Sequence, residues 1–326
     1  MIITRAPFRI SFCGGGSDIP YFYKEHGPGA VVSTSINKYM YCSAHPLFFN
    51  DGYLLKYSEI ENCSDVNKIN HKIIKEVFKD FGIKGIDFNS SADIPAGTGL
   101  SSSSAFTCAI IQLCSALTER YLKKEEIAEM AFNIEANKLG APIGKQDQYA
   151  SAFGGLNYIE FGRNGHVIVE KLFISKFGLE RLQNNLKLFY VGMPRDTNKV
   201  LSKQKDEVKK DINKIKQLRD MVILAKELKD ELLQNNIDAM GDYLHRNWLL
   251  KQQLNGDSKN DLINEIYLEG LNAGASGGKL LGAGGGGFML FYIKEQYHKS
   301  VKTKLQKYSE LEFKFDFKGT QTIFYD

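Results

Sequence analysis

The chain has 326 residues, of which 43% are hydrophobic and 25% charged, with a formal net charge of +4. This composition is ordinary for a globular protein, and mild basicity without a lysine-rich tail favours anionic small molecules over nucleic acid as ligands. No apolar run reaches the ~18–20 residues of a membrane span, and Arg5 and Pro7 interrupt the start of the chain where a signal sequence would need apolar residues. Five scattered cysteines without paired spacing indicate reduced thiols. We therefore expect a cytoplasmic protein without nucleic-acid or membrane partners, whose oligomeric state is open, a homodimer being one option.

Residues 1–172 mix expected strands with expected helices. Apolar residues at helical spacing predict the helices, and short β-branched or aromatic runs predict the strands. The strands are expected at Ile2–Ile3, Phe8–Phe12, Ala30–Ile36, Ile86–Phe88, Gly155–Phe161 and His166–Lys171, and the helices at Asn67–Phe81, Ala105–Arg120 and Lys124–Lys138. Such a mixture indicates the α+β class.

Residues 173–326 are richer in expected helix. The helices are expected at Lys199–Leu233, Ile237–Leu254 and Lys259–Asn272, and the strands at Leu188–Val191, Leu280–Ile293, Phe313–Phe317 and Thr322–Tyr325. The length suits two domains, which we divide into residues 1–172 and residues 173–326. No proline-rich linker separates them, so we expect the two halves to pack closely.

A turn rich in glycine and serine lies between an expected strand and an expected helix, in Pro95-Ala-Gly-Thr-Gly-Leu-Ser-Ser-Ser-Ser-Ala105. A helix start offers unpaired N–H groups and the positive end of the helix dipole, and glycines let an anion approach the backbone. One serine would suffice as a helix cap, so four favour a phosphate-binding loop over simple capping. The loop lacks the Gly-Lys-Ser/Thr of a Walker A motif.

Two further stretches combine glycine or carboxylate residues in unusual ways. Cys13-Gly-Gly-Gly-Ser-Asp-Ile-Pro20 follows an expected strand and is either a ligand-binding loop or a loose turn. Glu135 and Asp147 flank a Gly/Pro turn, and Glu135 shares the buried face of its helix. Phosphoryl transfer needs one carboxylate near Mg²⁺ and one near the attacking hydroxyl, although structural roles as caps or surface charges are the alternative.

A third glycine tract, Gly282–Gly287, satisfies the dinucleotide-binding pattern Gly-x-Gly-x-x-Gly. That pattern must open a helix, whereas Phe288–Ile293 is strand-like, so a dinucleotide site is excluded. A glycine tract entering a strand is typical of a place where a second backbone or a ligand comes close.

Three of these stretches together resemble the GHMP kinases, the superfamily of galactokinase, homoserine kinase and mevalonate kinase. Residues 6–18 resemble its substrate motif, residues 95–105 its nucleotide motif and residues 279–288 its C-terminal glycine-rich motif. Phe8–Asp18 and Gly144–Tyr149 are closest to the sugar-1-kinase branch that includes heptose 7-phosphate kinases. The resemblance implies an N-terminal domain like domain 2 of ribosomal protein S5, joined to a ferredoxin-like C-terminal domain.

The resemblance also implies ATP and Mg²⁺ as cofactors and assigns roles to residues. Ser103 and Glu135 would hold Mg²⁺, with Ser102 and Ser104 as alternative ligands, because Ser101 replaces the usual second glycine of the motif. Asp147 would orient or deprotonate the acceptor hydroxyl, and Arg9 would pair with it and favour its ionised form. The ATP-binding residues would be Pro95, Gly97, Thr98, Gly99, Leu100, Ser101, Ser102, Ser103, Ser104 and Ala105.

The acceptor is expected to be D-glycero-D-manno-heptose 7-phosphate, phosphorylated on its anomeric hydroxyl. The residues expected to bind it are Gly15, Gly16, Ser17, Asp18, Gly284 and Gly285, with Arg195, Lys199 and Lys145 as candidates for its phosphate. Gly15 and Gly16 replace the Glu-His of galactokinases, which disfavours galactose. The alternatives are another sugar-1-kinase, for fucose or an N-acetylhexosamine, and a non-catalytic sensor of sugar and ATP.

Overall fold

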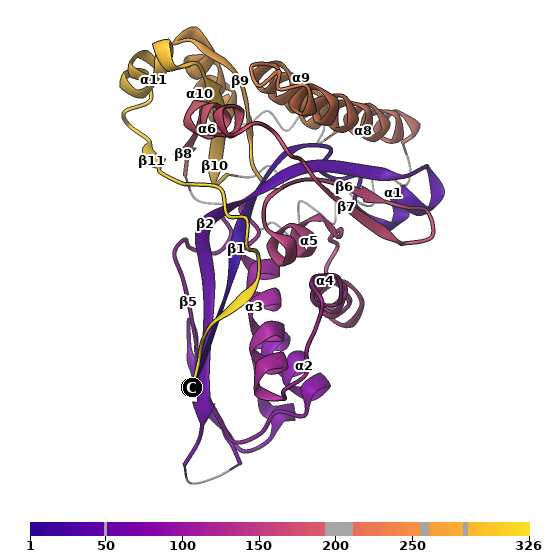
Figure 1. The fold of residues 1–326 in the computed structure, drawn as a ribbon, viewed down its shortest axis with the longest axis vertical. Helices are drawn as coiled ribbons and strands as arrows, with labels where there is room; N and C mark the ends of the chain where they lie inside the picture. Colours follow the sequence, from indigo (N-terminus) through magenta and orange to yellow (C-terminus); the bar gives the residue numbers. More distant parts are fainter. Residues whose placement is uncertain (49–50, 193–210, 255–260, 283–285) are drawn as a thin grey trace.

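The computed structural model describes residues 1–48, 51–192, 211–254, 261–282 and 286–326. Two sheets organise these residues (Figure 1). The larger sheet has the strand order β12-β1-β2-β5-β3-β4, and β6 pairs with β2 and β7 with β6. Its strands are β1 (Ile2–Cys13), β2 (Gly29–Pro46), β3 (Tyr53–Lys56), β4 (Ile60–Cys63), β5 (Ile86–Ala92), β6 (Leu156–Phe161), β7 (Val167–Lys171) and β12 (Gln321–Tyr325).

The antiparallel pair β1 and β2 forms the centre of this sheet. The two strands pair along almost their whole length, from Ile2 opposite Ala44 to Cys13 opposite Val32. The first part of β2 pairs with β6 and its last part pairs with β5. Strand β1 is continuous past both of these pairing regions. Arg9 and Ser11 therefore lie in its last part, just before the glycine loop that follows Cys13.

Four helices cover one face of the larger sheet (Figure 1). They are α2 (Lys72–Phe81), α3 (Ser102–Leu117), α4 (Lys124–Phe132) and α5 (Gln146–Phe153). Helix α3 lies against β1 and is buried on nearly all sides, which explains its run of alanine, isoleucine and cysteine. The first residues of α3 and α5, Ser102 and Gln146, lie close to the second half of the chain, residues 173–326.

The smaller sheet consists of β8 (Leu186–Tyr190), β9 (Ala275–Leu280), β10 (Phe288–Ile293) and β11 (Ser309–Leu311), in the order β11-β8-β10-β9. In chain order this is 4-1-3-2. Helices α8 (Ile212–Leu233), α9 (Ala239–Leu254) and α10 (Asp261–Asn272) lie between its first two strands, and α11 (His298–Lys304) lies between its last two. This is the ferredoxin-like arrangement, so the expected α+β fold class is confirmed.

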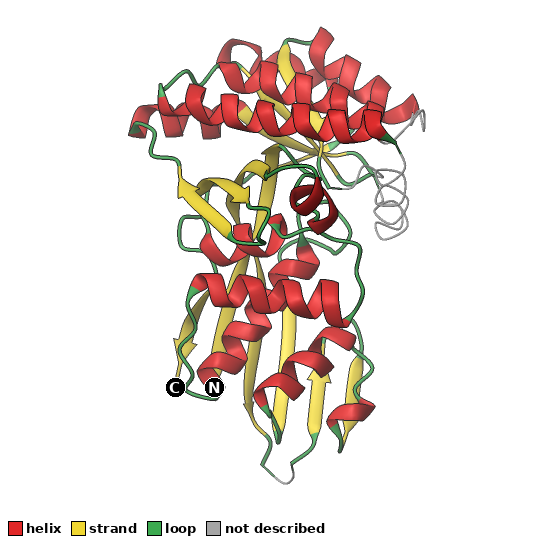
Figure 2. Cartoon of the chain, turned by 90° about the vertical axis from the view of Figure 1, so that its right-hand side faces the viewer, coloured by secondary structure: helices red, strands yellow, loops and turns green. Residues whose placement is uncertain are grey.

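The two halves share buried side chains, as expected from the missing linker. Phe22 of α1 (Pro20–Glu25) packs with Leu218 and Met221 of α8 and Leu254 of α9. Figure 2 shows α8 and α9 lying across the top of the larger sheet. The last strand, β12, returns to pair with β1. The division at residue 172 stays a prediction, but the chain's last strand belongs to the first sheet.

Two expected strands differ in the structure. The expected strand Leu280–Ile293 is only β10 (Phe288–Ile293), while Leu280 is the last residue of β9 (Ala275–Leu280). Gly282 and Gly287 take left-handed φ angles of 70° and 102° that a strand does not accommodate. Phe313–Phe317 is not a regular strand and forms only an isolated bridge between Phe315 and Ile36.

Short or weakly amphipathic elements escaped the sequence patterns. These are α1, β3, β4, α5, α6 (Lys176–Asn185), β9 up to its last residue, α11 and β11. The expected helix Lys124–Lys138 is α4 followed by a π-helical turn, Asn133–Lys138. In the described part of the chain, no helix has the length and apolar character to cross a membrane. All five cysteines are free thiols.

Candidate active site

A cavity of about 850 Å³ lies where the two halves of the chain meet. The first half contributes β1, the glycine loop (residues 13–18), the serine loop (residues 95–104), the π-helical turn and the start of α5. The second half contributes Met221 of α8, Lys251 of α9, Lys279 of β9 and Gly282. The cavity therefore has two walls of different origin, which we call the N-terminal wall and the C-terminal wall.

The serine loop gives the N-terminal wall its polar surface. The loop residues that line the cavity are Ala96, Gly97, Gly99, Ser101, Ser102, Ser103 and Ser104. Helix α3 begins at Ser102, so its first unpaired N–H groups lie beside the cavity. The remaining expected ATP-binding residues, Pro95, Thr98, Leu100 and Ala105, do not line the cavity. Thr98, Leu100 and Ala105 are buried and support the loop from behind.

The C-terminal glycine tract packs directly on the serine loop. A Cβ atom built on Gly282 would lie 2.5 Å from the Cα atom of Gly99, and one built on Gly287 would lie 2.2 Å from the carbonyl oxygen of Thr98. Such distances exclude any side chain. The tract therefore brings a second backbone close, one of the two explanations expected from its sequence.

Glu135 is held inside the N-terminal wall by the π-helical turn. Its side chain is buried, and its Oε2 accepts hydrogen bonds from Ser104 Oγ at 3.0 Å and from Gln148 Nε2 at 3.2 Å. Burial raises the pKa of Glu135 to about 7, with nearby Asp147 adding to the rise, while the hydrogen bonds from Ser104 and Gln148 oppose it. Its other oxygen, Oε1, is buried without a hydrogen-bond partner among the described residues.

These groups fit a magnesium ion that is also bound by substrate phosphates. A buried carboxylate oxygen without a partner is costly unless a cation or donor joins it. Mg²⁺ is commonly held by one or two carboxylates together with phosphate oxygens and water. Among the three candidate serines, Ser104 contacts Glu135, whereas Ser103 is exposed and donates no hydrogen bond to it. The geometry therefore favours Ser104 over the expected Ser103.

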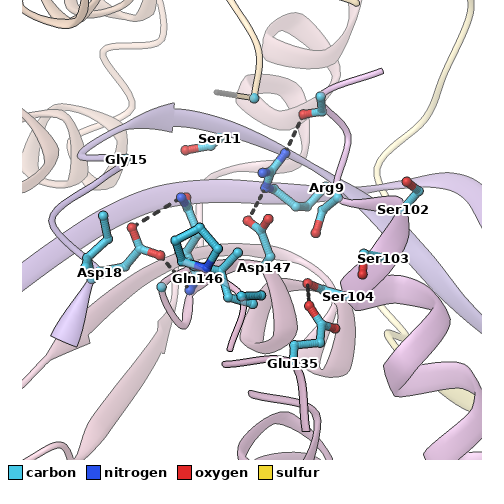
Figure 3. Close-up of a pocket in the computed structure, with 18 of the residues that line it drawn as sticks. Arg9, Ser11, Gly15, Asp18, Ser102, Ser103, Ser104, Glu135, Gln146 and Asp147 are labelled. Carbon is cyan, nitrogen blue, oxygen red and sulfur yellow. Dashed lines mark hydrogen bonds and ion pairs between the residues drawn. The ribbon is translucent and has the colours of Figure 1, made fainter. Parts of the chain in front are cut away.

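Asp147 and Arg9 form an ion pair in the middle of the cavity (Figure 3). Arg9 Nε donates to Asp147 Oδ1 at 2.8 Å, and Arg9 Nη1 donates to the carbonyl oxygen of Gly99 at 2.8 Å. The arginine side chain is 5% exposed and the aspartate side chain 27%. Arg9 thus ties the serine loop to Asp147 and leaves the other carboxylate oxygen of Asp147 without a bond to it.

Asp18 connects the glycine loop to the start of α5. Its Oδ1 accepts from the N–H of Gly16 at 3.0 Å, and its Oδ2 accepts from the N–H of Gln146 at 3.1 Å. The second bond caps α5 one residue before Asp147. Burial, together with the nearby Asp147, raises the pKa of Asp18 to about 6. A Cβ on Gly144 would lie 2.0 Å from Asp18 Oδ2, which explains that glycine.

Not every residue expected at the site lies in it. Ser17 is buried away from the cavity, and its hydroxyl bonds to Gly14 and Ala30. Lys145 does not line the cavity either, because its Nζ donates to Glu129 Oε1 at 2.5 Å and to the carbonyl oxygen of Gly165. The structure therefore removes the support for both as substrate-binding residues. Arg195, Lys199, Gly284 and Gly285 lie outside the described residues.

The structure adds residues that the sequence patterns did not single out. They are Ser11, Thr107, Gln146, Gln148, Lys251 and Lys279, all of which line the cavity or bond to a group that does. Ser11 and Lys279 lie within stretches already recognised by motif, whereas Lys251 lies on a helix with no motif.

Known proteins resemble this chain along most of its length. Residues 67–155 match the GHMP kinases N terminal domain, and residues 228–310 match the GHMP kinases C terminal family. A D-glycero-alpha-D-manno-heptose 7-phosphate kinase from Campylobacter jejuni is 29% identical over 304 residues, covering 90% of this chain and 89% of that protein. A mevalonate kinase from Pyrococcus furiosus is 30% identical over 287 residues, covering 86% of this chain and 77% of that protein.

Solved structures share the fold. The crystal structure of a D-glycero-D-manno-heptose 1-phosphate kinase from Bacteroides thetaiotaomicron has a TM-score of 0.82 and covers 100% of both chains. Its sequence is 22% identical to this one, so the likeness establishes the fold alone.

Proposed function

This chain belongs to the GHMP kinases and is an ATP-dependent sugar kinase, and we propose that its acceptor is D-glycero-D-manno-heptose 7-phosphate. In this proposal the γ-phosphoryl group of ATP passes to the anomeric hydroxyl, giving the 1,7-bisphosphate and ADP. The observation that carries the proposal is a single cavity that joins the serine loop, the Asp147–Arg9 pair and Glu135. The similarity to a heptose 7-phosphate kinase supports the choice of acceptor.

The serine loop is proposed to bind the phosphates of ATP. Its lining hydroxyls and the first N–H groups of α3 are donors, and the positive end of the helix dipole favours an anion there. GHMP kinases use ATP, and the residues present offer this nucleotide a cradle that is not of the Walker type.

Glu135 and Ser104 are proposed to hold Mg²⁺ against those phosphates. Their oxygens are hard ligands of the kind that Mg²⁺ prefers. When bound, the ion would neutralise negative charge on the phosphate oxygens.

Asp147 is proposed to receive the proton of the acceptor hydroxyl. As the hydroxyl oxygen bonds to the γ-phosphorus, the bond from that phosphorus to the bridging oxygen of ADP breaks. Arg9 occupies Oδ1 of Asp147, so the other oxygen is the one available for the proton. Arg9 also fixes the orientation of the carboxylate relative to the serine loop, which is the positioning that phosphoryl transfer requires.

The glycine loop is proposed to hold the sugar. Gly15 and Gly16 line the cavity without side chains, and Asp18 lies beside them, with its carboxylate already bonded to backbone N–H groups. The product would serve nucleotide activation of heptose for surface polysaccharide, in a cytoplasm that suits five free thiols.

The proposal is tested with an acceptor panel. Release of ADP is measured with purified protein, ATP, Mg²⁺ and heptose 7-phosphate, fucose, mannose or N-acetylhexosamines, and phosphorus NMR locates the new phosphate. We expect the highest kcat/KM for heptose 7-phosphate and a product phosphorylated at C1. A higher kcat/KM for fucose or an N-acetylhexosamine, or a product phosphorylated elsewhere, would contradict the proposal.

A further inference from the structure

Two lysines of the C-terminal wall have ammonium groups that bond only to backbone oxygens of the described residues. Lys279 Nζ donates to the carbonyl oxygen of Phe12 at 2.8 Å, and its side chain is buried. Lys251 Nζ donates to the carbonyl oxygens of Leu280 and Gly282. Both residues line the cavity.

The described residues provide these two lysines with no carboxylate partner. Every ion pair in the described chain involves other residues, and Asp147, one of the carboxylates that line the cavity, is paired with Arg9. Lys251, Lys279 and Arg9 also repel one another electrostatically. Buried charges are stable when they are paired, so this cluster is short of an anion.

A third donor precedes the residue that Lys279 contacts. Ser11 lines the cavity and is 7% exposed, and its hydroxyl has no hydrogen-bond partner among the described residues. It immediately precedes Phe12, whose carbonyl oxygen accepts from Lys279. A methyl group at Gly15 would lie 3.5 Å from Ser11 Oγ, so the hydroxyl faces the space that this glycine leaves open.

Of these donors, Ser11 lies on the glycine-loop side of the cavity, and Lys279 bonds to Phe12, just before that loop. Figure 3 shows Ser11 and Gly15 on the same side as Asp18, across Arg9 and Asp147 from Ser102, Ser103 and Ser104. Helix α9 is fixed to this loop, because the N–H of Gly14 donates to Asn247 Oδ1 at 3.1 Å, one helical turn before Lys251.

We propose that Lys251, Lys279 and Ser11 bind the phosphate that the acceptor already carries, an inference that rests on the function proposed above. Two ammonium groups and a hydroxyl match a dianionic phosphate in charge and in hydrogen bonding. The arrangement gives the protein a way to select phosphorylated sugars, with the phosphate of the acceptor held by the C-terminal wall and the phosphates of ATP by the serine loop.

The lowered pKa values of Lys251 and Lys279 are those expected of two buried ammonium groups that have no anion beside them. Burial lowers the pKa of Lys279 to about 8, with Arg9 adding to the effect and Cys13 opposing it. Burial, Lys279 and Arg9 lower the pKa of Lys251 well below its ordinary value. A bound phosphate would raise both values, so binding of the phosphorylated acceptor is coupled to protonation of the pair.

The test is calorimetric titration, without ATP, of wild type and of the double variant Lys251→Met, Lys279→Met with two ligands. The ligands are heptose 7-phosphate and the same heptose without phosphate. We expect wild type to bind the phosphorylated sugar at least about tenfold more tightly, about 1.4 kcal/mol, and the double variant to bind both within about twofold. The control Lys229→Met removes a positive charge on α8 that pairs with Glu170, and it should retain the wild-type preference.

The outcomes separate the two proposals. Equal binding of both sugars by wild type would contradict the phosphorylated acceptor and so the proposed function. A wild-type preference that survives in the double variant would overturn only the lysine site. Lys251 also borders the glycine tract next to the serine loop, so ATP is titrated separately into wild type and the double variant. A double variant that loses affinity for ATP but keeps the wild-type sugar preference would assign the two lysines to ATP instead.

A measurement on wild type covers the case in which the double variant does not fold. Above pH 8 each further pH unit removes about 90% of the remaining ammonium form of Lys279, so the Kd for heptose 7-phosphate should rise about tenfold between pH 8.5 and 9.5. Burial raises the pKa of the neighbouring Cys13 to about 12, so this thiol stays neutral in that range. The Kd for the unphosphorylated heptose should not change. Equal pH dependence for the two sugars would overturn the inference.

Discussion

The two walls of the cavity differ in chemistry and in how they are built. The N-terminal wall presents hydroxyls, helix N–H groups and the three carboxylates of Asp18, Glu135 and Asp147, together with Arg9 and Lys72. Apart from Arg9 and Ser11, which lie on β1, these groups come from loops and helical segments packed on the larger sheet. The C-terminal wall presents two lysines and Met221, carried by helices and a strand of the ferredoxin-like half. The first wall is suited to ATP with a cation, and the second to an anion without one.

Under the two proposals above, the serine loop meets the triphosphate of ATP, whereas the glycine loop and the C-terminal wall meet the acceptor. A change of acceptor would then act through the glycine loop, α9 and β9 and leave the serine loop unaltered. Each prediction below alters one wall, or the contact between them.

The largest of these effects is expected at Glu135. Glu135→Gln keeps the shape of the side chain but removes its charge, and loss of a metal's stabilisation of transferring phosphate is worth several kcal/mol. We expect kcat/KM at limiting Mg²⁺ to fall about 100-fold or more, with a higher Mg²⁺ concentration needed for half activity. The control Glu129→Gln alters a carboxylate that bonds Lys145 and Tyr149 outside the cavity. An unchanged Mg²⁺ titration in Glu135→Gln would make this residue structural.

The contact between the walls is tested at Gly282. Gly282→Ala places a Cβ 2.5 Å from the Cα atom of Gly99, at a φ angle of 70°. Gly140 has the same φ of 70°, but a Cβ there meets nothing within 4 Å. We expect Gly140→Ala to cost about 1–2 kcal/mol of stability from backbone conformation alone, and Gly282→Ala to cost about 1–3 kcal/mol more from the clash.

Thermal unfolding of the two alanine variants measures that difference. The serine loop meets the same contact from its own side, because a Cβ on Gly99 would lie 2.8 Å from the carbonyl oxygen of Leu281. Gly99→Val would therefore disturb this packing as well as ATP binding. Equal stability of Gly140→Ala and Gly282→Ala would mean that the two walls are not in the close contact described.

The smallest effect is expected at Ser101. This residue has a φ angle of 72°, in the left-handed region that glycine adopts without cost, and its side chain does not cap α3. Ser101→Gly should stabilise the protein without ligands by up to about 1 kcal/mol. Ser103→Gly, within the first turn of α3, should destabilise it by about 0.5–1 kcal/mol. Thermal unfolding measures both changes. A higher Tm for Ser101→Gly with a lower Tm for Ser103→Gly would support backbone strain at Ser101, and a lower Tm for both variants would contradict it.

The sequence predicted the N-terminal wall better than the C-terminal wall for a physical reason. Phosphate binding requires glycines and serines in a local order, so the serine loop is visible in one stretch of the chain. The left-handed φ of Ser101 likewise explains why related motifs carry glycine at that position. The α+β class and the ferredoxin-like half follow from element order and from the family resemblance.

The C-terminal wall could not be predicted from a local motif as a whole, because Met221, Lys251 and Lys279 are far apart in the sequence and come together only in the folded chain. Lys251 is one of many lysines on charged helices, and nothing in its neighbours distinguishes it from a surface charge. Its importance follows from burial next to Lys279 and from the absence of a carboxylate partner within the described residues. Lys145 is the reverse of Lys251. Its position in a recognised motif predicted a role in substrate binding, but its ammonium group bonds to Glu129 outside the cavity.

The central claim, that transfer occurs at Asp147 between the two walls, is tested most directly by Asp147→Asn. The substitution keeps the size of the side chain and removes the charge that accepts the hydroxyl proton. Removal of a general base costs about 10²–10⁴-fold, so kcat with heptose 7-phosphate should fall by that factor, while the Kd for ATP and the Kd for the sugar change less than about threefold. A kcat close to that of wild type would contradict the account.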